Sequence, residues 1–390
     1  MQASLGLRIL LLLLPLATTT GGLETQESAP PAPPAPEPAN ERASRRLDKL
    51  LAGGPEPALS VAVAAGGRVV FARAVGLADV EAETPASTAT RFRLGSTSKA
   101  LTSVALGQLV DERRLDLDAP VSRYLPDFPT KAHPFTARQL ASHQAGIRHY
   151  RGQAEYMNRT RYESVTDALA LFRDDPLLFE PGTRYSYSTH GYTLLSAVLE
   201  AADGRDFPAL MQRRVFTPLG MERTGPEWPE RDVEGRATYY QPGFGDALFR
   251  VPAVDNSCKW AGGGFESTPS DLATFGAALL AGRLVKEDTR ALLFTPNPLR
   301  DGSPNSEGYA LGWRSGRTEL PGHGREARIV HHGGTALGGR SFLALFPDDE
   351  VAVSLLANYH APQSPFGEFA GYAVELAAMF VDRGESEGNH

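Results

Sequence analysis

The chain concentrates its strongest β-strand signals near its two ends, and this arrangement limits the folds that it can adopt. Residues 57–79, PALSVAVAAGGRVVFARAVGLAD, contain two β-rich runs that meet at Gly66–Gly67, a pair suited to a tight primed turn. Residues 327–334 and 340–359 predict three more strands, with a turn at 347–349. Because an isolated hairpin is barely stable, we expect both ends of the chain to pair in one antiparallel sheet.

The segment between these ends, roughly residues 97–295, is expected to be mostly helix or loop. Residues 164–174, 192–204 and 270–282 each place apolar residues at helical spacing, and the last two end at a glycine. A final helix is predicted over residues 366–383. The sequence therefore predicts an α+β fold: an antiparallel β-sheet built from both terminal regions, flanked by helices, with an inserted, mostly helical lobe.

The N-terminal residues have the composition of a targeting segment rather than of a folded domain. A single arginine precedes an apolar run that is too short to span a bilayer comfortably, so residues 1–22 are interpreted as a signal peptide or an anchor. The proline-rich residues 23–46 are expected to form an extended linker. The folded domain would then occupy residues 47–383, followed by an acidic tail, 384–390. A secreted or periplasmic location follows, with attachment to the inner membrane as the alternative.

Composition excludes several classes of function. The 39 Lys and Arg residues are outnumbered by 46 Asp and Glu, which gives a formal charge of −7. No basic block stands out, so nucleic acid is not an expected partner. The single cysteine, Cys258, cannot form an internal disulfide. There is no H-E-x-x-H motif, and His331 and His332 would alternate across a strand, so neither a metal nor another cofactor is expected.

A serine and a lysine stand at the start of a predicted amphipathic helix in the stretch GSTSKALTSVAL. The helix should begin near Thr97, which puts Ser96 at its N-terminal end and Lys99 one turn further along the same face. Serine is a favoured N-cap, and capping alone would explain Ser96. Alternatively, Ser96 is a nucleophile and Lys99 is its proton acceptor, provided that burial lowers the pKa of the lysine. The helix N-terminus would favour an oxyanion developing there.

Two later segments supply the partners that such a nucleophile would need. Tyr187 lies in a polar turn before a helix, with Thr189 two residues on, and its phenol could reach into a cleft; Tyr185 could be mistaken for it. The stretch HHGGTALGG, expected between two strands, offers His331 for substrate contact. Gly333–Gly334 would let a ligand approach the backbone closely. The plainer alternatives are half-buried loop tyrosines and an exposed histidine pair on a hairpin.

In order along the chain these segments read S-x-x-K, Y-x-[NST] and H-x-G. This order resembles the serine β-lactamase and penicillin-binding superfamily, particularly its class C-like branch. The stretches SHQAGIRHY, YSTHGYTLL and VDNSCKWAGGGFEST are most similar to the mitochondrial serine β-lactamase-like group, which has a peptidase-type activity and assembles into filaments. The resemblance implies a β-lactamase/transpeptidase-like fold and a small-molecule or peptide substrate, and it leaves a homo-oligomer or filament open.

Matching positions carry the functional residues of that family over to this chain. Ser96 would be the acylated nucleophile, and Lys99 its base or proton relay. Tyr187 would shuttle a proton to and from the leaving group and the deacylating water. His331 would orient or electrostatically assist the substrate, and the N–H groups of Ser96 and Gly334 would form the oxyanion hole.

Two positions depart from the pattern of true β-lactamases. Thr189 stands where these enzymes have asparagine, and His331 stands where they have lysine, so a permanent positive charge for a substrate carboxylate is lost. Both changes favour a serine hydrolase that cleaves a peptide, amide or ester bond through an acyl-enzyme on Ser96. The alternatives are a β-lactamase or D,D-carboxypeptidase acting on cell-wall peptides, and a low-turnover scaffold or sensor that polymerises. The retained Ser–Lys–Tyr set argues against the scaffold.

Overall fold

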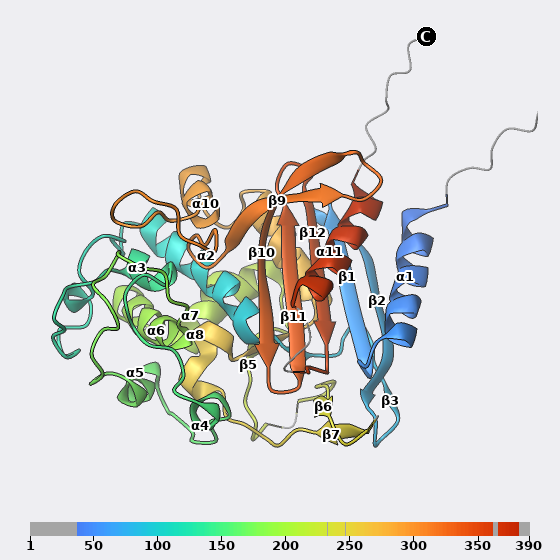
Figure 1. Ribbon diagram of the computed structural model, residues 1–390, viewed down its shortest axis with the longest axis horizontal. Helices are drawn as coiled ribbons and strands as arrows, with labels where there is room; N and C mark the ends of the chain where they lie inside the picture. The colour runs from blue at the N-terminus through green and yellow to red at the C-terminus, as the bar shows by residue number, and fades with distance from the viewer. Residues whose placement is uncertain (1–36, 232, 246, 362–365, 382–390) are drawn as a thin grey trace, which may run out of the picture. The chain divides into compact units, whose positions relative to one another are not determined.

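The structure is a computed structural model that describes residues 37–231, 233–245, 247–361 and 366–381 (Figure 1). The predicted leader, most of the proline-rich linker and the acidic tail lie outside these residues. Within the described ranges, none of the helices has the length and apolar character needed to cross a membrane. The same ranges contain no group of three or more His, Cys, Asp or Glu arranged to hold a metal ion.

Both ends of the chain meet in one seven-stranded sheet. Its strand order is β3 (Thr84–Pro85), β2 (Arg68–Asp79), β1 (Ala58–Ala65), β12 (Val351–Ala357), β11 (Gly339–Phe346), β10 (Arg325–Ala336) and β9 (Arg314–Leu320). β1 and β12 are antiparallel, with Leu59 opposite Ala357, and Figure 1 shows these two strands side by side. The N-terminal hairpin turns at Gly66–Gly67, where both residues have positive φ as a primed turn requires. The expected pairing of the two ends is confirmed.

Some strands were not predicted from the sequence. β9 is an edge strand, and most of its residues are partly or fully exposed, so it has no run of buried apolar residues to reveal it. Several short strands lie within the stretch expected to be helix or loop: β4 (Phe92–Arg93), β5 (Gly225–Pro226), β6 (Tyr240–Pro242), β7 (Leu248–Arg250) and β8 (Phe265–Ser267). The HHGG stretch lies within β10, as the strand predicted over 327–334 implies, but β10 continues to Ala336, so the turn to β11 falls only at 337–338.

Helices cover both faces of the large sheet. α1 (Ala39–Gly53) and α11 (Phe366–Phe380) pack on one face, as Figure 1 shows, while α9 (Pro269–Leu280) and the helical lobe pack on the other. β1 shows the alternation that this requires, because Val61 belongs to the core under α1 and α11 and Ala62 to the core under α9. α9 approaches the sheet closely at Gly276, where an added Cβ would lie 2.7 Å from the Cβ of Ala352.

The helical lobe contains more helices than the sequence predicted. Its helices are α2 (Ser98–Asp111), α3 (Ala137–Ala141), α4 (Gln153–Tyr156), α5 (Val165–Ala168), α6 (Thr189–Asp203), α7 (Phe207–Met211), α8 (Trp260–Gly263) and α10 (Glu287–Phe294). α6 ends at Gly204 with φ +78°, as its glycine predicted. The helix expected over 164–174 is instead split into α5 and a 3₁₀ turn over 169–171.

The expected linker is shorter than predicted. α1 begins at Ala39, so residues 39–46 are helical rather than extended. The dense prolines end at Pro38, and the residues that follow place Ala43, Leu47 and Leu50 on one buried face of a helix. Helical periodicity begins as soon as proline stops preventing it.

Candidate active site

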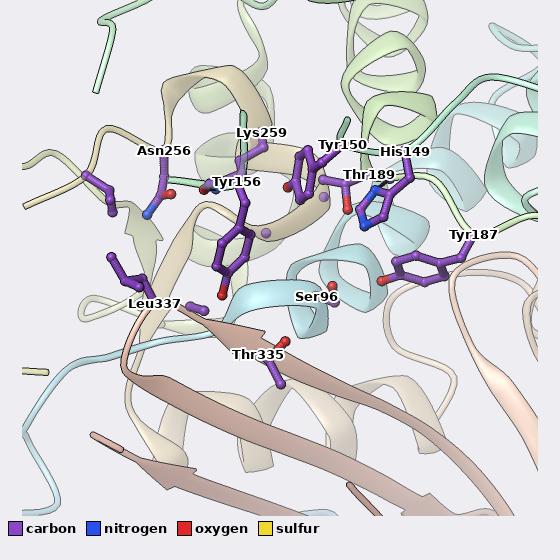
Figure 2. Close-up of a pocket in the computed structure, with 14 residues that line it drawn as sticks. Ser96, His149, Tyr150, Tyr156, Tyr187, Thr189, Asn256, Lys259, Thr335 and Leu337 are labelled. Atoms are coloured by element: carbon purple, nitrogen blue, oxygen red, sulfur yellow. Dashed lines mark hydrogen bonds between the residues drawn. The ribbon is translucent and has the colours of Figure 1, made fainter. Parts of the chain in front are cut away.

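Ser96 lies in a single 3₁₀ turn, η1 (Gly95–Thr97), which connects β4 to α2. Thr97 occupies the N-cap position of α2, and no side-chain hydrogen bond caps this end, so capping does not explain Ser96. α2 is not amphipathic as predicted, because every residue from 98 to 107 is buried. Ser96 is therefore fixed at the end of a helix that runs through the protein interior, and Figure 2 shows it at the centre of a cleft.

The fully buried side chain of Lys99 directs its amine at Ser96. Nζ lies 3.1 Å from Ser96 Oγ, 3.3 Å from Thr189 Oγ1 and 2.5 Å from the carbonyl oxygen of Gly262. Burial lowers the pKa of Lys99 well below its usual value, and the positive charges of Arg314 and Lys259 lower it further. A lysine in this state can be present as the neutral amine, which is able to accept the proton of a serine hydroxyl.

Tyr187 approaches Ser96 from the turn before α6. That turn is fixed by Ser188, whose Oγ accepts a hydrogen bond from the N–H of Gly191 at 2.8 Å. Burial raises the pKa of Tyr187 to about 12, although a hydrogen bond with Ser96 opposes this shift. The phenol therefore keeps its proton at neutral pH and can donate it, whereas Lys99 can accept one. Tyr187 borders the cleft, and Tyr185 is not among the residues that line it.

The two histidines of the HHGG stretch point to opposite faces of the sheet. His332 is 1% exposed, and its Nε2 lies 2.9 Å from the hydroxyl of Tyr309. Its pKa is well below the usual range because it is buried, and because Arg314 and Lys99 are nearby. The ring of His331 instead stacks on Phe342, 5.2 Å away, which belongs to the core under α1 and α11. Both histidines border the cleft, but the ring on the α2 side belongs to His332, one residue after the expected His331.

Two glycines bring β10 against the nucleophile turn. A Cβ added to Gly334 would lie 1.9 Å from the carbonyl oxygen of Leu94 and 2.8 Å from the backbone nitrogen of Ser96. A Cβ added to Gly95 would lie 2.4 Å from the carbonyl oxygen of Thr335. No side chain fits in either space, so glycine at both positions lets the strand and the turn meet backbone to backbone. Gly333 and Thr335 border the cleft on either side of Gly334.

His149 is a site residue that the sequence analysis did not single out. Its Nδ1 accepts a hydrogen bond from the backbone N–H of Thr189 at 3.2 Å. Burial lowers the pKa of His149 to about 4, so the ring is neutral at pH 7 and carries its proton on Nε2. It therefore offers a hydrogen-bond donor in the cleft beside Thr189, the position where asparagine was expected in true β-lactamases (Figure 2).

Arg314 is a second residue that was missed, because the strand that carries it was not predicted. It lies at the start of β9, with its guanidinium 5.3 Å from the centre of the Tyr309 ring and 5.9 Å from that of Tyr187. It borders the cleft together with both histidines. The permanent positive charge that appeared to be lost with the family lysine is thus present, carried by a different strand.

The cleft extends to both sides of Ser96. On one side is a cavity of about 150 Å³, here called the lysine pocket, whose walls include Tyr150, Tyr156, Asn256, Lys259 and Leu337. The other side has a cavity of about 400 Å³, here called the arginine pocket. Its walls include Arg314, His331, His332 and Gly333. Ser96, Tyr187 and Thr335 border both, so a substrate can lie across the serine with groups in each pocket.

Comparison with known proteins identifies the family. The Beta-lactamase family model matches residues 44–378. The chain belongs to the beta-lactamase family. It is a serine hydrolase of the β-lactamase and penicillin-binding type, as the sequence predicted.

Relatives of this beta-lactamase family member include enzymes and a mitochondrial protein. It is 32% identical to the human serine beta-lactamase-like protein LACTB, mitochondrial, over 84% of this chain and 77% of that protein. It is 29% identical to a D-aminopeptidase of Cereibacter sphaeroides, over 83% of this chain and 60% of that enzyme. The predicted resemblance to the mitochondrial group is confirmed.

Solved structures confirm the fold. The D-amino acid amidase of Ochrobactrum anthropi, complexed with D-phenylalanine, superposes with a TM-score of 0.74 over 88% of this chain and 99% of the amidase, at 22% identity. An octameric penicillin-binding protein homologue from Pyrococcus abyssi gives a TM-score of 0.72 over 87% of this chain and 77% of that chain, at 23% identity. Both likenesses support the α+β architecture with its inserted helical lobe.

Proposed function

We propose that this hydrolase cleaves a peptide, amide or ester bond through a covalent acyl-enzyme on Ser96. Lys99 accepts the proton of the Ser96 hydroxyl as Oγ attacks the substrate carbonyl carbon. The N–H of Ser96, with N–H groups of the Gly333–Thr335 segment, faces the negative charge that develops on the carbonyl oxygen. Tyr187 donates a proton to the leaving nitrogen or oxygen as its bond to the carbonyl carbon breaks.

Deacylation reverses these proton movements with water as the nucleophile. Water attacks the ester carbonyl carbon and gives a proton to the amine–phenol pair of Lys99 and Tyr187. The bond between that carbon and Ser96 Oγ then breaks, and Oγ takes up a proton again. The observation that carries the proposal is the 3.1 Å contact between Ser96 Oγ and a lysine amine whose pKa burial has depressed. A scaffold would gain nothing from burying this amine against a hydroxyl.

The names of the relatives favour an amide bond. A D-aminopeptidase and a D-amino acid amidase are among the proteins that resemble this chain. Arg314 supports a second candidate function, carboxypeptidase action, because its charge could bind a free carboxylate on the leaving group. Matched substrates with a free or an amidated leaving-group carboxylate distinguish the two: an amidase or aminopeptidase should cleave both, and a carboxypeptidase only the free acid.

The test of the proposed function is covalent labelling of folded protein with a fluorophosphonate probe and with penicillin, read by mass spectrometry. An adduct on Ser96 is expected with at least one probe, and none in Ser96→Ala. Absence of an adduct with both probes would leave the scaffold or sensor as the better account. A penicillin adduct that persists would indicate a penicillin-binding type of site, and rapid loss of that adduct would indicate β-lactamase turnover.

We also propose that the chain is exported to the periplasm or secreted, with an inner-membrane anchor as the alternative. The basis is the short apolar run within residues 1–22 and the proline-rich stretch after it. Fractionation of the producing cells would test this, and recovery with the cytoplasmic fraction would contradict it.

A further inference from the structure

One residue, His143, holds the turn that carries Tyr187 from both sides. The N–H of Ser186, which precedes Tyr187, donates to the backbone carbonyl oxygen of His143 at 2.9 Å. The N–H of Ser188, which follows Tyr187, donates to Nδ1 of the His143 ring at 3.2 Å. The centre of that ring lies 4.3 Å from the centre of the Tyr187 ring. The backbone and the side chain of His143 therefore both contact the segment that places the phenol.

His143 has a backbone conformation that glycine adopts more readily. It follows α3, and its φ is +60°. Its own N–H donates to the carbonyl oxygen of Leu140 at 3.2 Å, and the N–H of Gln144 donates to that of Gln139 at 2.7 Å. These two bonds form the Schellman motif that ends many helices, in which the residue with positive φ is usually glycine. A histidine is less favoured here than glycine, so ending the helix does not explain it.

The ring of His143 also leaves one polar atom unsatisfied. The residue is 2% exposed, and Nε2 has no hydrogen-bond partner among the described residues. Burial, together with the charge of Lys99, lowers the pKa of His143 well below its usual value, so the ring is neutral. Because Nδ1 accepts a hydrogen bond, the proton is on Nε2, where an unpaired N–H costs stability. The hydrogen bond that this ring makes is thus the one to the residue after Tyr187.

Proton transfer depends on where the Tyr187 phenol lies. The phenol hydrogen-bonds with Ser96, and Figure 2 shows its hydroxyl directed at that serine. Tyr187 lies before the first residue of α6, Thr189, so the helix does not include it and its neighbours must hold it in place. A shift of about 1 Å in such a group can slow a reaction by about 10²-fold. The two bonds to His143 therefore bear directly on the rate.

We propose that His143 is a positioning residue that holds Tyr187 where its phenol can protonate the leaving group. The decisive bond is the one that Nδ1 accepts from the N–H of Ser188, because it fixes the residue directly after Tyr187. His143 itself neither gives nor takes a proton in the reaction. This inference rests on the proposed function, because His143 acts through the proton that Tyr187 donates.

The experiment compares two esters that share an acyl group and differ in the proton that their leaving groups need. p-Nitrophenolate is a weak base and leaves p-nitrophenyl butyrate without a proton, whereas the strongly basic ethoxide of ethyl butyrate must be protonated as it leaves. His143→Leu should therefore lower kcat/KM about 10- to 100-fold more for the ethyl ester than for the p-nitrophenyl ester. Both esters are measured on the same protein, so a loss of folded enzyme cancels from the ratio of the two values. Tyr187→Phe should change this ratio in the same direction and at least as far.

Four further variants separate positioning from a general structural role. His143→Asn keeps an acceptor at the place of Nδ1 and tolerates positive φ, so it should keep most of the wild-type ratio. His143→Gly tolerates that φ without an acceptor and should behave like His143→Leu, which it replaces should the leucine variant not fold. Adding His143→Leu to Tyr187→Phe should not change the ratio further, because the group that His143 positions is then absent. His133→Leu, at an exposed histidine, should keep the wild-type ratio.

The outcomes distinguish this inference from the proposed function. The inference is overturned by an unchanged ratio in both His143→Leu and His143→Gly, by an equally large change in His143→Asn, or by a further change in the Tyr187→Phe background. A wild type that cleaves only the p-nitrophenyl ester overturns it too, because no proton donor would then be in place. In each of these cases fluorophosphonate labelling of Ser96 leaves the acyl-enzyme intact. Failure of the wild type to be labelled, or to cleave either ester, would instead contradict the proposed function.

Discussion

Two buried lysines lie near Ser96 in different surroundings: Lys99 contacts the serine itself, and Lys259 lines the cavity beside it. Lys99 has a reactive hydroxyl and a carbonyl oxygen at its amine, and the neighbouring charges of Arg314 and Lys259 act with burial to lower its pKa. The pKa of Lys259 is also lowered by burial, but Cys258, Glu227 and Asp255 oppose this shift. Burial thus lowers the pKa of both amines, and the neighbouring charges add to this shift at Lys99 and mostly oppose it at Lys259.

The difference teaches that burial alone does not assign a role to a lysine. Desolvation acts on both amines, and the surrounding charge strengthens its effect on the pKa of Lys99 and weakens its effect on that of Lys259. Lys99 is within reach of the atom that loses a proton, whereas Lys259 contacts aromatic rings and a peptide carbonyl. Of the two, only Lys99 is therefore placed for proton transfer with Ser96.

The largest expected difference is between the rates at which Ser96 is labelled in two single variants, Lys99→Met and Lys259→Met. Lys99→Met removes the proton acceptor and should slow fluorophosphonate labelling of Ser96 by about 10²–10⁴-fold, the usual contribution of general base catalysis. Lys259→Met should slow it much less, because this side chain does not touch the serine. Both labelling rates are measured from time courses in which the reaction is quenched at intervals. Thermal melts confirm that each variant is folded. Equal losses in the two variants would mean that the lysines do not differ in role.

The pH dependence of labelling should show that the charges of Arg314 and Lys259 lower the pKa of Lys99. The rate should rise with pH as Lys99 loses its proton at a lowered pKa, and fall as Tyr187 ionises at about 12. Arg314→Gln removes a positive charge that disfavours protonated Lys99, so the rising limb should move to higher pH by about half a unit to one unit. Lys259→Met should move it in the same direction by less. A rising limb that stays in place in both variants would contradict the charge coupling.

The last prediction concerns how the free energy of unfolding of the wild type and of Lys99→Met depends on pH. The pKa of Lys99 is lower in the folded than in the unfolded protein, so between these two values the unfolded chain binds more protons and stability rises with pH. Below the folded value, the wild type must bury a protonated amine, and Lys99→Met avoids this cost. Urea unfolding should therefore favour Lys99→Met more at about pH 6 than at about pH 9, by about 1.4 kcal/mol for each pH unit of that interval that lies above the pKa of folded Lys99. A difference between the two proteins that is independent of pH would show that the fold does not change the protonation of Lys99.

The sequence predicted the fold where local patterns and side-chain burial agree. β1 and β12 are rich in β-branched and apolar residues and are almost wholly buried, so their runs were easy to recognise. β9 carries polar residues on an exposed edge, and it is held by pairing with β10 and by contact with α11. Because these contacts are distant in the sequence, no local pattern could predict β9.

The site was predictable where its geometry depends on helical spacing. Ser96 and Lys99 are three residues apart, and the structure brings their side chains together. The choice between His331 and His332 depends on the register of β10, and a one-residue change reverses the face of the sheet. Lys259 contacts Tyr156, which lies 103 positions away in the sequence, so its place at the cleft could not be read from local patterns.

The pairing of β1 with β12 has a consequence for synthesis of the protein. Leu59 finds its partner at Ala357, so almost the entire chain must leave the ribosome before the middle of the sheet can close. Until then the N-terminal hairpin lacks its neighbour and exposes apolar side chains and an unpaired strand edge, which favours aggregation or capture by a chaperone. A nascent chain that ends before β12 is expected to remain without its core.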